Sequence, residues 1–167
     1  MANTLEQLRV DIGKALKADS GIIGKQAVCK LVSKVLLDDE FVARHLTADQ
    51  CRPREVLYED PELGLRICGH VYEKPAHGAP HDHGSSWAIY GLAVGGTEMT
   101  DWRIVKKGEG NAPTLVEPVK TYTMKPGDSY FYDVGVVHSP NRGGLTKLVR
   151  IEGANLDRIQ RSNIKAA

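Results

Sequence analysis

Three histidines have the residue type and the spacing to hold one metal ion. His81 and His83 are separated by a single residue, and His138 follows the turn-forming segment 133–135. On a β-strand, side chains two residues apart point to the same face, so imidazoles at 81 and 83 can reach a common ion. Neutral imidazole is a ligand that suits iron, zinc, nickel and copper. The pattern therefore predicts that His81, His83 and His138 form a metal site.

Charged and polar side chains on two other strand-like patterns are candidates for contact with a substrate. Arg150 and Glu152 alternate on a late strand, and Arg66, His70 and Tyr72 alternate on an earlier one. We expect the late strand to lie beside the strand of the paired histidines. If it faces the metal, the arginine can anchor an oxyanion and the glutamate can act as a general base, which makes both candidate catalytic residues. The alternative is that these two side chains neutralise each other as a partly buried ion pair.

The elements that must position these residues change in character near residue 50. Before it, apolar residues recur at helical spacing and predict helices over 5–16, 27–36 and 38–46, with Thr4 as the N-cap of the first. After it, period-two patterns alternate with Gly and Pro turns. The expected strands lie near 65–72, 87–94, 99–105, 115–124, 129–132 and 148–151. Short strands at this spacing predict an all-β barrel or sandwich.

Length and charge restrict the class of protein further. The chain has 167 residues, which suits one domain, and 22 basic against 21 acidic residues give a net charge of +1. This balance predicts neither a nucleic-acid partner nor a membrane partner, and no apolar run reaches the ~20 residues of a membrane helix. Residues 1–10 lack the pattern of a secretory signal, and an odd count of three cysteines favours a reducing compartment. We therefore expect a cytoplasmic monomer or homodimer.

The spacing of the histidines and glycines resembles the two motifs of the cupin superfamily. In the first motif His81 and His83 are followed by Ala88, at the usual glutamate position, and by Gly95. In the second motif, Gly127 and the segment 133–135 precede His138, with aspartate in place of the usual proline. The resemblance implies a mainly β, single-domain jelly-roll barrel over 51–155. A helical segment of two or three helices, 1–50, would pack on it, and 156–167 would form a short helix or a loose tail.

Within the cupins, the sequence looks most like the cysteine dioxygenase branch. It has His-Gly at 77–78 before the paired histidines, Asp-Trp at 101–102, and an aromatic run at 130–132 leading into the second motif. The resemblance implies a non-haem iron(II) centre with three histidine ligands that uses O2 on a small anionic substrate, a thiol or another bidentate acid. Zinc, nickel and manganese are the alternative metals. Without a carboxylate ligand the ion keeps its full charge, which favours an anionic substrate.

The sequence departs from that branch at three places. Ala88 stands where some members have a cysteine that crosslinks to tyrosine, so no crosslink can form from this position. The Ser-His-Tyr network of thiol dioxygenases is replaced by Leu148, Arg150 and Glu152. Arg54 precedes the paired histidines at nearly the spacing of the arginine that binds the substrate carboxylate. The resemblance therefore makes it a substrate-binding candidate, beside Arg66, His70 and Tyr72.

Two other functional classes remain open at this point. One is a metal-dependent cupin lyase or isomerase without O2 chemistry, and the other is a cupin that only binds a small molecule. Glu98 is an alternative carboxylate ligand, although it lies beyond Gly95-Gly96 in the next expected strand.

Overall fold

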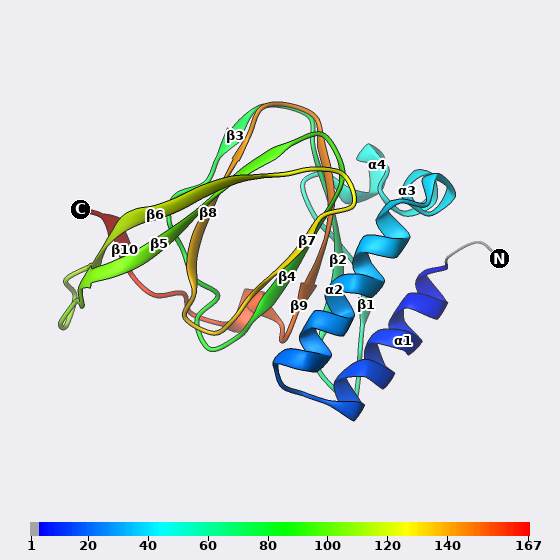
Figure 1. The fold of residues 1–167 in the computed structure, drawn as a ribbon, viewed down its shortest axis with the longest axis horizontal. Coiled ribbons are helices and arrows are strands. Elements are labelled where there is room, and N and C mark those ends of the chain that lie inside the picture. The colour runs from blue at the N-terminus through cyan, green and yellow to red at the C-terminus, as the bar shows by residue number, and fades with distance from the viewer. Residues whose placement is uncertain (1–3) are drawn as a thin grey trace.

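The computed structural model describes residues 4–167, in which helices at the N-terminal end precede two curled β-sheets (Figure 1). The helices are α1 (Leu5–Ala18), α2 (Ile22–Leu36), α3 (Asp39–His45) and α4 (Ala48–Cys51). The strands are β1 (Glu55–Glu59), β2 (Arg66–Tyr72), β3 (Ala76–His77), β4 (Ala88–Val94), β5 (Thr97–Lys106), β6 (Thr114–Met124), β7 (Ser129–Tyr132), β8 (Val137–Arg142), β9 (Thr146–Glu152) and β10 (Ile164–Ala166). A short 3-10 helix, Leu156–Arg158, lies between β9 and β10.

The strands form two five-stranded sheets. One has the order β1-β2-β9-β4-β7 and the other has the order β10-β6-β5-β8-β3. Neighbours pair antiparallel, except that β10 pairs parallel with β6. Figure 1 shows α1 and α2 against the outer face of the first sheet, and the β5–β6 hairpin extending away from the helices. This is the mainly β architecture with preceding helices that the sequence predicted.

The helices begin where the sequence supplies caps. The Thr4 hydroxyl accepts a hydrogen bond from the Gln7 N–H at 3.0 Å, which confirms the predicted N-cap of α1. Helix α2 begins at residue 22 rather than 27, just after the Asp19 carboxylate accepts hydrogen bonds from the N–H groups of Gly21 and Gly24. Helix α4 and the strands β1, β3, β8 and β10 were not predicted from the sequence.

Two separate cores follow from the alternation of side chains along the first sheet. On β4, Ile89 and Ala93 face the helices, whereas Tyr90 and Leu92 face the interior between the sheets. Gly91 lets α2 approach closely, because a Cβ atom there would lie 2.4 Å from Val32 Cγ1. Burying a large apolar side chain contributes about 1.5–3 kcal/mol, so the helical core holds the sheet firmly from outside. The inner face of the sheet is thereby left free to carry polar side chains.

The last twelve residues are more ordered than the expected short helix or loose tail. The 3-10 helix is the short helix, but a strand at this end was not expected. In β10, Ile164 pairs with Thr114 of β6. Between these elements, Ser162 is hydrogen-bonded to Asp82, on the segment of the paired histidines. We call residues 159–163 the C-terminal strap.

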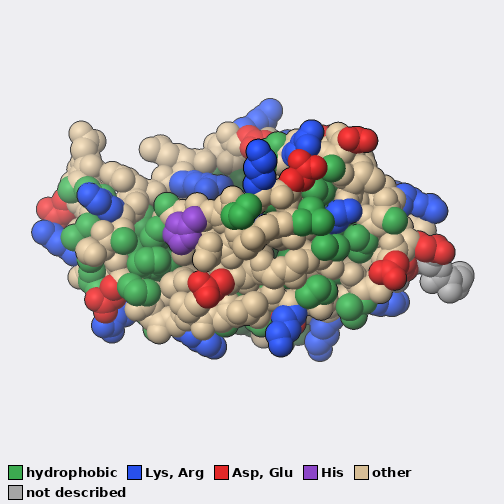
Figure 2. Space-filling model, turned by 90° about the horizontal axis from the view of Figure 1, so that it is seen from above, with side chains coloured by type: hydrophobic (Ala, Val, Ile, Leu, Met, Phe, Trp, Pro, Cys, Tyr) green, Lys and Arg blue, Asp and Glu red, His purple; other side chains and the backbone are tan. Residues whose placement is uncertain are grey.

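Acidic and basic side chains are interspersed on the face of the molecule in Figure 2, in keeping with the net charge of +1. In the described range, 4–167, no helix is both long and apolar enough to span a membrane.

Candidate metal centre

The structure brings the three predicted histidines together. His138 lies on β8, and His81 forms an isolated antiparallel bridge with it through two backbone hydrogen bonds of 3.0 Å. His83 follows in a loop rather than on a strand. One ligand atom from each of the three rings lies within 4.8 Å of the others. The expected strand of the paired histidines is thus reduced to a single bridge, yet the two rings still converge on the third.

Backbone carbonyl groups orient two of the rings. His81 Nδ1 lies 2.9 Å from the carbonyl oxygen of Ala79, and His138 Nδ1 lies 3.3 Å from that of Val136. A carbonyl oxygen only accepts hydrogen bonds, so each Nδ1 carries the proton and the lone pair remains on Nε2. This is the arrangement in which metal-bound histidines are usually held.

Two buried ring nitrogens at this site have no hydrogen-bond partner. They are Nε2 of His138 and Nδ1 of His83, and both side chains are almost completely buried. Buried polar atoms nearly always have a partner, and the exceptions need a physical explanation. A metal ion bound between the rings would supply the missing contact, so the residues present fit a three-histidine centre.

The surroundings also hold these imidazoles in the neutral form that a metal requires. Burial, and next the neighbouring His81, lower the pKa of His83 to about 3 and that of His138 to about 2. Burial lowers the pKa of His81 as well. No proton therefore competes with a metal ion for these nitrogens near neutral pH.

Asp82 fixes the backbone between the paired histidines. Its carboxylate accepts hydrogen bonds from the Ser162 hydroxyl at 2.5 Å and from the N–H groups of Gly84 and Ser162 at 3.0 and 3.1 Å. Burial opposes ionisation, but these hydrogen bonds lower the pKa of Asp82 below its ordinary value. The carboxylate is therefore turned toward the C-terminal strap and away from a role as a ligand.

No carboxylate completes the cluster among the described residues. Ala88 is fully buried at the start of β4, packed in the interior core, and its methyl group cannot bind a metal ion. Glu98 is exposed on β5 and is not part of the cluster, so it is not the alternative ligand.

A pocket of about 310 Å³ opens beside His81, and we call it the arginine pocket. Its lining includes the side chains of Tyr72, His81, Tyr90, Arg142, Arg150 and Arg161. Tyr90 connects the pocket to the metal centre, because its hydroxyl lies 3.4 Å from His83 Nε2 and 3.5 Å from a terminal nitrogen of Arg150. A small molecule in this pocket would lie next to the candidate metal ligands.

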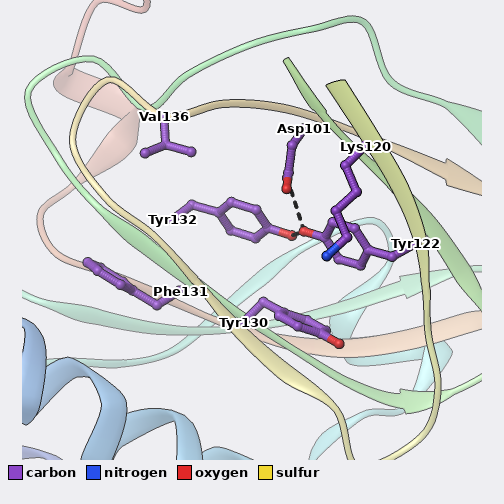
Figure 3. Close-up of a pocket in the computed structure, with 7 residues that line it drawn as sticks. All are labelled: Asp101, Lys120, Tyr122, Tyr130, Phe131, Tyr132 and Val136. Atoms are coloured by element: carbon purple, nitrogen blue, oxygen red, sulfur yellow. Dashed lines mark hydrogen bonds between the residues drawn. The ribbon is translucent and has the colours of Figure 1, made fainter. Parts of the chain in front are cut away.

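A second pocket, of about 300 Å³, is lined in part by Tyr132 and is shown in Figure 3. The Tyr132 ring stacks on His138, with centroids 4.0 Å apart. Its hydroxyl lies 2.7 Å from that of Tyr122, which in turn donates to Asp101 at 3.1 Å. This chain of contacts fixes Tyr132 and so supports the ring of His138 from the side.

Comparison with known proteins identifies the fold. No family model and no curated protein matches the sequence. Among solved structures, the chain is similar to an uncharacterised conserved protein with a double-stranded β-helix domain from Klebsiella pneumoniae. The identity is 16%, the alignment covers 74% of this chain and 88% of that chain, and the TM-score is 0.50. The chain has the double-stranded β-helix, or cupin, fold.

Two further structures are similar to this chain at lower scores. KdgF from Halomonas sp. is 17% identical, with 64% of this chain and 83% of that chain covered and a TM-score of 0.45. The DMSP lyase DddQ from Ruegeria pomeroyi is 13% identical, with 65% of this chain and 49% of that chain covered and a TM-score of 0.46. These likenesses concern the fold and not the reaction.

Arg150 and Glu152 point into the interior, but their strand is not where it was expected. The neighbours of β9 are β2 and β4, whereas the paired histidines lie outside the named strands beside β8. Arg150 Nε donates to Glu152 Oε1 at 2.9 Å, and Arg54 donates to both Glu152 oxygens at 3.0 Å. Arg150 lines the arginine pocket and the fully buried Glu152 does not. The two residues therefore form the ion pair of the alternative hypothesis while the arginine still reaches the pocket.

Of the four substrate-binding candidates, the structure places one in the lining of the arginine pocket and three outside it. Tyr72 lines the arginine pocket, and His70 lies buried beneath it with Nδ1 3.1 Å from the Tyr72 hydroxyl. Arg54 and Arg66 do not line the pocket; both contact Asp157, and Arg66 also contacts Glu59. Their guanidinium groups serve ion pairs that hold the 3-10 helix against the first sheet.

Arg142 and Arg161 line the pocket and were not singled out from the sequence. Arg142 lies four residues after His138 on β8, and residues of even separation on a strand share a face. Recognising β8 would therefore have placed both side chains in the interior. No sequence signal pointed to Arg161, because its position depends on the strap crossing back over the barrel.

Proposed function

We propose that this cupin is a mononuclear non-haem metal enzyme, a dioxygenase that oxidises a small anionic molecule with O2. The observation that carries the proposal is the convergence of three neutral imidazoles, without a carboxylate, beside a pocket containing arginine. Three neutral ligands leave the full charge on a divalent ion, which favours an anionic donor from the substrate. Iron(II) bound here would supply open coordination positions for the substrate and O2 together. The motif resemblance to cysteine dioxygenases supports iron over zinc, nickel or manganese.

The residues around the pocket have separate tasks in this proposal. Arg150 presents a guanidinium to the substrate, and Tyr90 bridges it to His83 through its hydroxyl. Glu152 contacts Arg54 and Arg150 from below and does not reach the pocket, so we assign it to positioning Arg150 rather than to moving a proton.

The substrate is expected to differ from that of cysteine dioxygenase. The inner face of β9 carries Leu148, Arg150 and Glu152 in place of a Ser-His-Tyr network. No imidazole or phenol on this strand can therefore contact a thiolate bound at the metal. We expect L-cysteine to be a poor substrate, and efficient turnover of cysteine to its sulfinic acid would contradict this.

Metal analysis followed by oxygen consumption tests the proposal. The purified protein is assayed for bound metals, stripped, and reloaded anaerobically with iron(II), zinc, nickel or manganese. O2 uptake is then measured with a panel of thiols, diketones and phenolic acids, with His83→Ala as the metal-deficient control. Iron-dependent O2 uptake with one substrate class supports the proposal. Turnover without O2 uptake would instead identify a lyase or isomerase, and binding without turnover would identify a binding protein.

A further inference from the structure

Arg142 is a buried cation without a counter-charge. Its side chain is only 8% exposed, and among residues 4–167 it forms no ion pair. Its Nε is buried without a hydrogen-bond partner, and its guanidinium lies over the Tyr72 ring, 4.2 Å from the centroid. Burying an unpaired charge is costly, so such a group normally has a partner. A partner for Arg142 would therefore be an anion bound in the pocket that this side chain lines.

Arg161 brings a second guanidinium to the same pocket from the C-terminal strap. It is exposed, and it too forms no ion pair within the described chain. The next residue, Ser162, is hydrogen-bonded to Asp82 through both its hydroxyl and its N–H. The strap also packs on Gly84, where a Cβ atom would lie 2.5 Å from the carbonyl oxygen of Gln160. The backbone that carries Arg161 is therefore fixed against the loop of the metal ligands.

The third arginine of the pocket is already neutralised. Arg150 is paired with Glu152, which also accepts hydrogen bonds from Arg54. Arg142 and Arg161 are thus the cations of this pocket whose charge no described carboxylate balances. A metal ion held by three neutral imidazoles would add a further uncompensated charge at the His81 end.

We infer that Arg142 and Arg161 form an anion-binding subsite apart from the metal, so that the molecule this cupin accepts carries two acidic groups. One group binds at the metal end beside His81, and the other, a carboxylate or a phosphate, is held by the two guanidiniums. Guanidinium groups match both oxyanions with paired hydrogen bonds. A volume of about 310 Å³ lies at the small end of ligand sites, which restricts the molecule to a short dianion. The substrate class rests on the proposed function, whereas the subsite does not.

Anion binding to the metal-free protein tests the subsite without any turnover. Calorimetric titrations at constant ionic strength compare acetate, malonate, succinate and inorganic phosphate. The variants are Arg142→Gln and Arg161→Gln, with Arg158→Gln as the control, since Arg158 is exposed on the 3-10 helix and does not line the pocket. In the metal-free protein we expect acetate and the dianions alike to bind through one oxyanion held by the two guanidiniums. After loading with zinc, the dianions should gain affinity over acetate, because their second acidic group can then reach the ion. Each pocket variant should weaken dianion binding by about tenfold or more, because a charge-assisted hydrogen-bond pair is lost, and the control should leave it unchanged.

The comparison of carboxylates with phosphate shows which oxyanion the guanidiniums prefer, and either preference supports the subsite. Absence of anion binding, or equal losses in Arg158→Gln and Arg161→Gln, would overturn it. Equal gains of acetate and the dianions on zinc loading would overturn the assignment of a second acidic group to the metal end. If Arg142→Gln does not fold, Arg161→Gln still decides, because the latter side chain is exposed. The proposed function fails separately, through absence of iron-dependent O2 uptake in the metal assay. A protein that binds dianions but consumes no O2 would therefore keep the subsite and lose the dioxygenase.

Discussion

His83 and His138 each have one buried ring nitrogen without a hydrogen-bond partner. Each ring is buried, and burial holds its pKa far below the ordinary value, at about 3 and about 2. A buried, neutral and unpaired imidazole destabilises an empty site because a polar atom has lost water without replacement. A metal ion bound there would relieve this cost, so the same atoms that weaken the metal-free protein would provide affinity for the ion.

We predict that replacing any one of His81, His83 or His138 by alanine lowers metal content to a small fraction of the wild-type value. Two neutral ligands hold a divalent ion much less tightly than three, and each alanine leaves a ligand position to water. The measurement is the metal content of the purified variants after dialysis. His77→Ala is the matched control, because that side chain is exposed on β3 and lies outside the cluster. Full occupancy in the triple-alanine variant would disprove the assignment.

Glu152 and Arg150 give a prediction that separates positioning from proton transfer. Glu152→Gln removes the carboxylate shared by Arg54 and Arg150, so we expect the free energy of unfolding to fall by about 3 kcal/mol while kcat stays nearly unchanged.

Arg150→Met leaves the carboxylate paired with Arg54. It should mainly raise KM for the anionic substrate, by about 30-fold for the loss of ~2 kcal/mol of charge-assisted bonding. Urea unfolding and steady-state kinetics check both. A hundredfold loss of kcat in a stable Glu152→Gln enzyme would instead make Glu152 the general base.

At the scale of elements, β2 and β9 form a polar inner face backed by an apolar outer one. In their register, Cys68 lies opposite Arg150 and His70 opposite Leu148, while Ile67 and Val71 face the helices. Burial, and next the charges of Arg150, Arg54 and Arg142, lower the pKa of His70 well below its ordinary value. His70 is therefore neutral when the protein is folded.

This placement of His70 predicts a pH dependence of stability. In the unfolded chain an imidazole takes up a proton near pH 6.5, whereas His70 in the folded protein does not, so the unfolded state binds more protons below that pH. The contribution of His70 is fully present above about pH 6.5 and is lost as the pH falls. We expect His70→Gln to reduce the slope of unfolding free energy against pH, between pH 6 and 4.5, by about 1.4 kcal/mol per pH unit. Urea titrations of the metal-free protein measure this slope, with the exposed His77→Gln as the control. A slope that is unchanged in His70→Gln and equal to that of His77→Gln would refute the assignment of His70 as a buried neutral imidazole.

The sequence predicted those elements and ligands whose signals are local. The three histidines and the long strands could be found because motif spacing and period-two alternation are read within a few residues. β8 was missed because Ser139, Pro140 and Asn141 in its centre are typical of a turn. Because β8 was not predicted, Arg142 was not predicted to lie in the interior either, although this residue shares the strand face of His138. The strap was missed because the contact of Asp82 with Ser162 joins segments far apart in the sequence, and nothing local predicts it.

At the scale of the whole molecule, the barrel is supported from two sides. The N-terminal helices press on the outer face of the first sheet, and the chain end returns along the opening of the barrel to join the second sheet through β10 (Figure 1). The C-terminal strap, between the 3-10 helix and β10, thereby runs alongside the segment that carries His81 and His83. One segment therefore contributes Arg161 to the pocket and Ser162 to the support of the histidine pair.

This arrangement predicts that Ser162→Ala weakens both the fold and the metal site. The hydroxyl donates at 2.5 Å to the Asp82 carboxylate, which lies between two candidate metal ligands, so its loss should lower the unfolding free energy by about 1 to 2 kcal/mol. For a domain of this size the corresponding fall in Tm is about 2–8 °C. Contacts that support metal ligands from behind typically change affinity by 10–100-fold, so we expect metal binding to weaken by about tenfold. Ser85→Ala, exposed on the same loop, is the control. Differential scanning calorimetry and a competitive metal titration give the two values. Wild-type metal affinity in a Ser162→Ala protein of lowered Tm would show that the strap stabilises the barrel without positioning the metal ligands.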